Sequence, residues 1–154
     1  MKYVYIPAAL LVVVVVGFAT IKKVSPVSWG WWGTTNTSDS VALKGFDPVT
    51  YFEESEPAMG SALYTFEWAD ATWQFANKGN RDRFSENPDE YAPRLGSFCA
   101  FAVSKGFTAD ADPEAWHIAD GRLYVFADKN VRDQWVAELD RGSLEASNRN
   151  WAKR

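Results

Sequence analysis

The first 21 residues differ from the rest of the chain in their hydrophobic pattern. Nineteen consecutive residues, Tyr3–Ile21, carry no charge, and Leu10–Val16 contains only Leu and Val. As an α-helix at about 1.5 Å per residue, this run would extend roughly 28 Å, close to the ~30 Å hydrocarbon core of a bilayer. The pattern predicts an N-terminal transmembrane anchor over residues 1–23. The small residues Gly17 and Ala19 leave open a signal peptide that is cleaved after export.

Residues 24–42 are rich in Ser, Thr and Gly and contain three tryptophans. Residues 33–40 are mostly polar, which is typical of a flexible linker. Trp29, Trp31 and Trp32 have two interpretations. They fit an aromatic belt at the membrane surface, where indoles are enriched, or a contact surface for a partner subunit, because Trp is over-represented at interface hot spots. We interpret the segment as a Trp-rich juxtamembrane linker.

Short periodic segments follow in residues 43–154, which we interpret as one folded domain. Ala62–Trp68 and Thr72–Ala76 alternate between apolar and polar residues, and this period predicts two strands joined by a short turn. The clearest hairpin is Ala115–Phe126, because two β-prone runs flank Asp120-Gly121, a typical type I′ turn.

Helices are expected after two capping residues. Asn77 and Asp128 can each accept a hydrogen bond from an unpaired amide, and helices are predicted from there to about Arg83 and over Lys129–Leu139. Val49–Phe52 is β-prone and predicts a further short strand. We find no internal repeat. The expected architecture is α+β, a small antiparallel sheet with helices packed on one face, preceded by one N-terminal transmembrane helix.

The charge distribution bears on possible partners. All 20 acidic residues lie at or beyond Asp39, whereas Lys2, Lys22 and Lys23 flank the apolar segment, so 13 basic residues face 20 acidic ones and the remainder carries a net charge of −7. Nucleic acid and anionic lipid surfaces attract the opposite sign, so a nucleic-acid partner is not expected. The lysines on the two sides of the apolar segment nearly balance, so the positive-inside rule leaves the orientation open.

Six motifs occur in order between Leu43 and Trp151. They are Gly45–Phe52 (GFDPVTYF), Phe84–Pro93 (FSENPDEYAP), Gly96–Val103 (GSFCAFAV), Asp112–Trp116, Asp120–Tyr124 and Asn150-Trp151. Together they resemble the motifs of the YHS-domain proteins, in the longer, exported branch of that family. The resemblance implies a small α+β domain with an export signal or membrane anchor, in a family whose members mostly have no assigned activity.

The resemblance also bears on metal binding. In shorter, cysteine-rich relatives attached to metal-transporting ATPases, cysteines occupy the positions that correspond to Thr50, Asn77 and Asn80. An amide or hydroxyl cannot replace a thiolate for a soft ion such as Cu(I), so we expect that metal site to be lost here. Phe66 stands where relatives often have His before Glu-Trp, so a function that depends on that imidazole is not expected either.

Cys99 and His117 are the only thiol and the only imidazole of the chain. Cys99 lies among apolar residues, and because burial raises a thiol pKa, a structural role is favoured. His117 alternates with Trp116 and Ile118, so it should face solvent if those two face the core. The alternative is a metal-handling or thiol-redox module that uses Cys99, with His117 as a second ligand for a transition metal such as copper, although further ligands would then be required.

No catalytic constellation is evident. The chain offers one His as a base, no Ser in a nucleophile elbow and no Gly-rich phosphate loop before a helix. We therefore expect a non-catalytic, YHS-like domain without a resident cofactor. It would be held at the cell membrane by a single span, on the periplasmic or extracytoplasmic side. There it would contact lipid through residues 3–21 and serve as a binding module or accessory subunit of a membrane protein complex.

Overall fold

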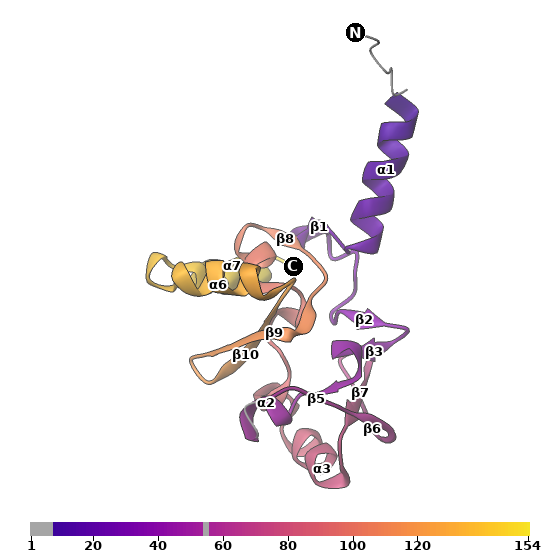
Figure 1. The fold of residues 1–154 in the computed structure, drawn as a ribbon, viewed down its shortest axis with the longest axis vertical. Coiled ribbons are helices and arrows are strands. Elements are labelled where there is room, and N and C mark those ends of the chain that lie inside the picture. Colours follow the sequence, from indigo (N-terminus) through magenta and orange to yellow (C-terminus); the bar gives the residue numbers. More distant parts are fainter. Residues whose placement is uncertain (1–7, 54–55) are drawn as a thin grey trace.

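The computed structural model describes residues 8–53 and 56–154. Its first element, α1 (Ala8–Ile21), extends away from the other elements as a single helix (Figure 1). Among the described residues, no helix has both the length and the apolar character needed to cross a membrane. The beginning of the predicted apolar span, residues 3–7, lies outside the described residues.

Among the described residues, the first of two longer β-hairpins consists of β6 (Ser61–Trp68) and β7 (Ala71–Phe75), which pair antiparallel. The turn residues Ala69 and Asp70 both have positive φ, 51° and 59°. Such two-residue turns match the right-handed twist of the strands that they join. The helix α3 (Lys78–Glu86) follows and packs on both strands. The strand and helix predictions for this stretch are confirmed.

The second hairpin consists of β9 (Asp112–Ala119) and β10 (Arg122–Phe126), again antiparallel. Asp120 and Gly121 have φ values of 49° and 68°, as the sequence predicts for a type I′ turn. The helix α6 (Lys129–Ala137) follows and packs on both strands. This hairpin and its helix are therefore confirmed as well.

The two hairpin–helix units form an internal repeat. Their strands have 8 and 5 residues in each unit, and their helices have 9. The N-cap side chains of Asn77 and Asp128 each accept a hydrogen bond of 2.9 Å from the amide three residues later. Sequence identity is concentrated in Phe-Ala-x-Lys at 75–78 and 126–129, followed by Arg-Asp in each helix. The expectation that the chain has no repeat is therefore wrong, because the backbone pattern persists where most side chains differ.

A left-handed turn precedes each unit. These turns are η2 (Leu43–Gly45) and η3 (Leu95–Ser97), and all three residues of each turn have positive φ. The chain then enters a short helix, α2 (Thr50–Glu53) in the first unit and α5 (Ala100–Ser104) in the second. The duplication thus extends beyond the hairpins to the segments that lead into them.

Helix α2 occupies the place where the sequence predicts a strand over Val49–Phe52, and that prediction is wrong. The side chain of Asp47 accepts a hydrogen bond from the amide of Val49 at 2.9 Å. The hydroxyl of Thr50 donates to the Asp47 carbonyl at 2.8 Å. These local bonds close a turn and start a helix, and they outweigh the β propensity of the side chains.

The remaining strands are short and complete several small sheets. They are β1 (Ser25–Pro26), β2 (Thr37–Ser38), β3 (Val41–Ala42), β4 (Phe46–Asp47), β5 (Ala58–Met59) and β8 (Phe107–Thr108). The largest described sheet has the order β2-β3-β7-β6, with β3 parallel to β7; β1 pairs with β8, β4 with β5 and β9 with β10. The α+β class is confirmed. The single antiparallel sheet is not observed, because the two hairpins belong to different sheets and helices pack on each of them.

The core consists of two hydrophobic clusters with β10 between them. Leu123 and Val125 point into the first cluster, whereas Tyr124 and Phe126 point into the second. Successive side chains of a strand face opposite sides, so one strand contributes to both clusters. The largest fully buried side chains belong to Trp73, Phe75, Phe84, Tyr51, Phe98, Phe126 and Trp135.

The segment predicted as a linker, residues 24–42, is part of the folded domain. Ser25 and Val27 are buried, and β1 pairs with β8. Asn36 is also buried; its backbone amide donates to Gly96 at 2.7 Å, and its side chain donates to the Asp110 carboxylate at 3.0 Å. The polar groups of this segment form hydrogen bonds within the domain, so the segment is ordered by the fold, unlike a flexible linker.

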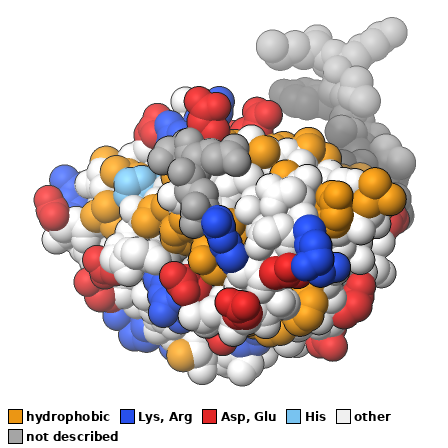
Figure 2. All heavy atoms as spheres, turned by 90° about the horizontal axis from the view of Figure 1, so that it is seen from below, with side chains coloured by type: hydrophobic (Ala, Val, Ile, Leu, Met, Phe, Trp, Pro, Cys, Tyr) orange, Lys and Arg blue, Asp and Glu red, His pale blue; other side chains and the backbone are white. Residues whose placement is uncertain are grey.

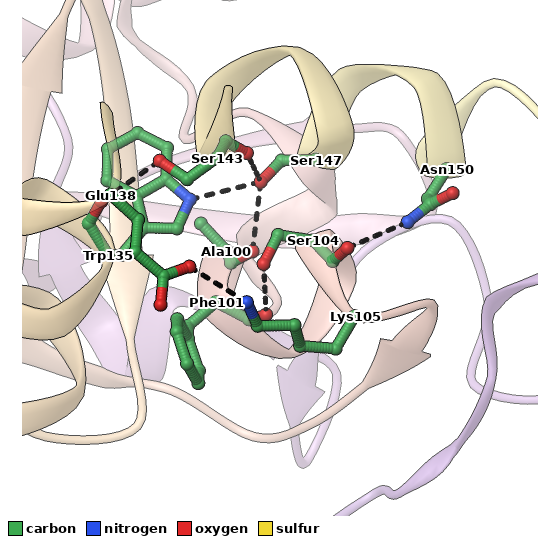
Figure 3. Close-up of polar contacts among 9 residues, drawn as sticks. All are labelled: Ala100, Phe101, Ser104, Lys105, Trp135, Glu138, Ser143, Ser147 and Asn150. Carbon is green, nitrogen blue, oxygen red and sulfur yellow. Dashed lines mark hydrogen bonds and ion pairs between the residues drawn. The ribbon is translucent and has the colours of Figure 1, made fainter. Parts of the chain in front are cut away.

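The C-terminal helix α7 (Ser143–Trp151) is joined to α5 and α6 by buried polar contacts (Figure 3). The hydroxyl of Ser147 accepts a bond from the indole of Trp135 at 3.1 Å and donates to the Ala100 carbonyl at 3.0 Å. At the other end of α7, the amide of Asn150 donates to the Ser104 carbonyl at 3.0 Å. The remaining short helices are η1 (Val27–Trp29), α4 (Pro88–Tyr91) and η4 (Leu139–Arg141).

Candidate functional site

Cys99 lies immediately before α5 and is only 1% exposed. Its backbone forms a parallel bridge with Val125 of β10. Burial raises the pKa of the thiol, and hydrogen bonds from the backbone of Ala102, Ala127 and Phe101 oppose this only in part. A thiol in these surroundings is protonated at neutral pH and inaccessible to reagents in solution.

Asp47 is a buried carboxylate in the first unit. Its side chain is fully enclosed, and its Oδ1 accepts the Val49 amide at 2.9 Å. Its Oδ2 accepts the amide of Ala76 at 2.8 Å and the side-chain amide of Asn80 at 2.7 Å. Three N–H donors thus compensate for the loss of water around the carboxylate. Asp47 joins α2, β7 and α3 at a single point.

Asp47 and Cys99 occupy equivalent positions in the two units. Each follows the left-handed turn of its unit by two residues and lies directly beside the Phe-Ala pair that ends the second strand of the hairpin. Cys99 receives backbone hydrogen bonds from Phe101 and Ala127, as Asp47 does from the corresponding amides of its own unit. The buried thiol is therefore the counterpart of a structural carboxylate.

Thr50, Asn77 and Asn80, which the sequence resemblance aligns with cysteines of shorter YHS-domain proteins, lie close to Asp47. Thr50 donates to the Asp47 carbonyl and accepts the Ala58 amide at 3.1 Å. Asn80 donates to the Asp47 carboxylate, and Asn77 caps the helix that carries Asn80. These side chains offer hydroxyl and amide groups rather than thiolates, and they are engaged in internal hydrogen bonds.

His117 is half-buried, and its ring lies 6.3 Å from that of Trp135 in an edge-on arrangement. Burial lowers its pKa, and the nearby guanidinium of Arg132 lowers it further. The prediction that His117 faces open solvent is wrong. Trp116 and Ile118 do pack on the first cluster, but the opposite face of the hairpin is covered by α6.

Among the described residues, no third side chain completes a metal site with the two candidate ligands, Cys99 and His117. Cys99 belongs to the second cluster, and His117 packs at its edge against Trp135. Within the part of the chain that the structure describes, no group of three or more His, Cys, Asp and Glu side chains is arranged to hold a metal ion.

The three N-terminal tryptophans differ in how far they are exposed to solvent. Trp29 and Trp31 are 55% and 67% exposed, and their ring centroids lie 4.4 Å apart at a tilt of 40°. Trp32 is half-buried and packs on the second cluster. Phe107 of β8 is also exposed, and β8 and its partner β1 lie beside the lower end of α1 (Figure 1). Trp29 ends η1, which directly follows β1, and Phe107 lies on β8; we call Trp29, Trp31 and Phe107 the exposed aromatic group.

A half-open pocket of about 730 Å³ lies at the junction between the two units. Its lining includes Trp68 and Trp73 of the first hairpin and Trp151 of α7. Arg94, from the segment between the units, and Arg154 contribute positive charge. We call this cavity the junction pocket. Its size and mixed lining are typical of a small-molecule site.

Neither the role of Asp47 nor the junction pocket is evident from the sequence alone. Asp47 lies in the YHS-like motif, but its equivalence to Cys99 requires an alignment of the two units. The pocket has no sequence signal, because Trp68, Arg94 and Trp151 are far apart in the chain and are brought together by packing.

The fold and this site define a duplicated α+β domain with a pocket between its units. No family model, no curated protein and no solved structure matches the chain.

Proposed function

We propose that this protein is a membrane-anchored, non-catalytic YHS-like domain that acts as a binding module or accessory subunit of a membrane protein complex. The observation that carries the proposal is the exposed Trp29–Trp31 pair. Two indoles that contact each other and remain exposed to water are hydrophobic surface left uncovered, and Trp is among the residues that contribute most to protein interfaces. Other tryptophans of the domain, such as Trp73 and Trp135, are fully buried.

The apolar segment supports the membrane part of the proposal. In α1 the side chains of Val15, Val16, Phe18 and Ile21 are all more than half exposed, so the domain does not cover them. Lipid contact through residues 3–21 would remove this surface from water. Resemblance to the exported branch of the YHS family supports a single span with the domain on the periplasmic or extracytoplasmic side.

The surface charge supports a protein partner rather than a nucleic acid. Acidic and basic side chains are interspersed with hydrophobic ones over the face seen from below (Figure 2). A nucleic-acid partner would call for a continuous basic patch, which that face lacks. A mixed, moderately acidic surface is compatible with a protein contact made elsewhere by the exposed aromatic group.

The test is purification of the tagged full-length chain from native membranes in mild detergent. The double variant Trp29→Ser/Trp31→Ser removes both exposed indoles. Leu63→Ser is the matched control, since Leu63 is 84% exposed but lies on β6. We expect the wild-type chain and the control to retain the same stoichiometric partner and the double variant to lose it.

Two results would contradict the proposal. One is a wild-type chain that always purifies alone, and the other is a double variant that retains its partner in full. The membrane part fails separately if the mature protein starts after Ala19 and is recovered free of the bilayer. The alternative, a metal-handling or thiol-redox module using Cys99, has less support because the sulfur is buried and the pKa of the thiol is raised.

A further inference from the structure

The junction pocket depends on a close backbone approach at Gly96. Gly96 has a φ of 59°, and a Cβ placed there would lie 2.1 Å from the Thr34 carbonyl oxygen and 3.1 Å from the Trp151 ring. On the other side of the pocket, the hydroxyl of Thr35 donates to the Ala69 carbonyl at 2.8 Å. The N-terminal segment, the turn between the units and α7 are thus held together around the cavity, and its shape is set before any ligand enters.

Arg154 supplies an unusual charge within this cavity. Its guanidinium lies 4.5 Å from the Trp151 ring centroid and 5.6 Å from that of Phe98. Its Nη1 atom is buried and has no hydrogen-bond partner. Burial also lowers the pKa of this guanidinium, although an arginine remains charged at neutral pH. Stacking on an aromatic face holds the group in place but gives the Nη1 donors no hydrogen-bond partner.

The other polar groups of the pocket favour an anion. Arg94 adds a second arginine to the lining, whereas the side chain of Asn148 is already hydrogen-bonded to Tyr124. Asp89 is the acidic residue of the lining. The charged side chains of the lining are thus two arginines and one aspartate, a local charge opposite in sign to that of the domain as a whole.

We propose that the junction pocket binds a small organic carboxylate with an aromatic or apolar body. The carboxylate pairs with the guanidinium of Arg154, whose Nη1 has no partner within the protein, because the planar fork of a guanidinium matches a carboxylate in two parallel hydrogen bonds. The apolar body lies between the indoles of Trp68 and Trp151. This inference goes beyond the proposed function and does not depend on the membrane anchor or on the exposed aromatic group.

The experiment uses the full-length chain in detergent, with benzoate as the probe and benzamide as its neutral counterpart of nearly the same shape. Binding is followed by saturation-transfer NMR, with empty micelles as a blank. We expect benzoate to bind at least about tenfold more tightly than benzamide. Arg154→Gln should abolish this preference. Arg149→Gln, which removes an exposed arginine of α7 outside the pocket, should leave it unchanged.

A second variant guards against a folding defect in Arg154→Gln. Ala152 is exposed at the pocket, so Ala152→Trp fills the cavity without changing its charge and should eliminate binding of both probes. Equal affinity for benzoate and benzamide, or full benzoate affinity in Arg154→Gln, would overturn the proposal. So would binding of a peptide through its terminal carboxylate with no binding of benzoate, because the ligand would then be a protein end.

Discussion

Replacing the buried carboxylate of Asp47 is expected to destabilise the whole domain. In Asp47→Ala, the amides of Val49 and Ala76 and the side chain of Asn80 lose their acceptor. Hydrogen bonds to a charged group contribute about 1.5–3 kcal/mol each, and a buried donor left unpaired costs about 1–3 kcal/mol. The total loss is smaller than the sum of these three contributions, because the structure, chiefly the side chain of Asn80, can rearrange. We therefore expect the free energy of unfolding to fall by about 3–5 kcal/mol.

The assay is urea unfolding of the purified chain, followed by tryptophan fluorescence. Asp47→Asn keeps the shape of the side chain and one acceptor oxygen, but its NH2 group points at a donor. Its free energy of unfolding should therefore fall by roughly half as much as that of Asp47→Ala. Asp140→Ala, at an exposed position, is the control and should change stability by less than about 0.5 kcal/mol. A loss below about 1 kcal/mol in Asp47→Ala would show that the three hydrogen bonds do not hold α2, β7 and α3 together.

Three further predictions concern Cys99, His117 and Gly96. Cys99 should react with a thiol reagent at least about 100-fold more slowly in the folded chain than in urea, and rapid labelling of the folded chain would contradict its burial. Because the pKa of His117 is lowered by burial and then by Arg132, its contribution to stability is present above about pH 6.5 and is lost as the pH falls through the folded pKa. Unfolding curves at pH 7.5 and 5 should therefore converge in His117→Gln. Gly96→Ala should lower stability by about 1–3 kcal/mol through strain at its positive φ, and an unchanged melting temperature would contradict the close approach to Thr34.

Much of the local structure could be predicted from the sequence. Asp120-Gly121 between two β-prone runs specifies a hairpin, because few residues tolerate positive φ at both turn positions. Asn77 and Asp128 specify helix starts, because their side chains accept the amide three residues later. Each of these signals lies within a few neighbouring residues.

Other features could not be predicted because they depend on distant residues. The alternation of Trp116, His117 and Ile118 places the imidazole on the opposite face from its neighbours, but only α6, from a later part of the chain, decides that this face is covered. The composition of residues 24–42 is typical of a linker, but in the fold their polar groups form hydrogen bonds with the distant residues Gly96 and Asp110. The candidate site could be predicted only in part for the same reason: the sequence indicates Cys99 but not its counterpart in the first unit, Asp47.

Neighbouring residues alone specify the two long hairpins, the capped helices that follow them and the uncharged N-terminal segment, because turn geometry, capping and hydrophobic period are set by adjacent residues. The repetition of the two units, the correspondence of Asp47 with Cys99 and the pocket at the junction are evident only from the packed fold. Packing selects for shape and burial rather than for particular side chains, so a carboxylate and a thiol can occupy equivalent places. Residues from remote segments meet in the pocket through tertiary packing.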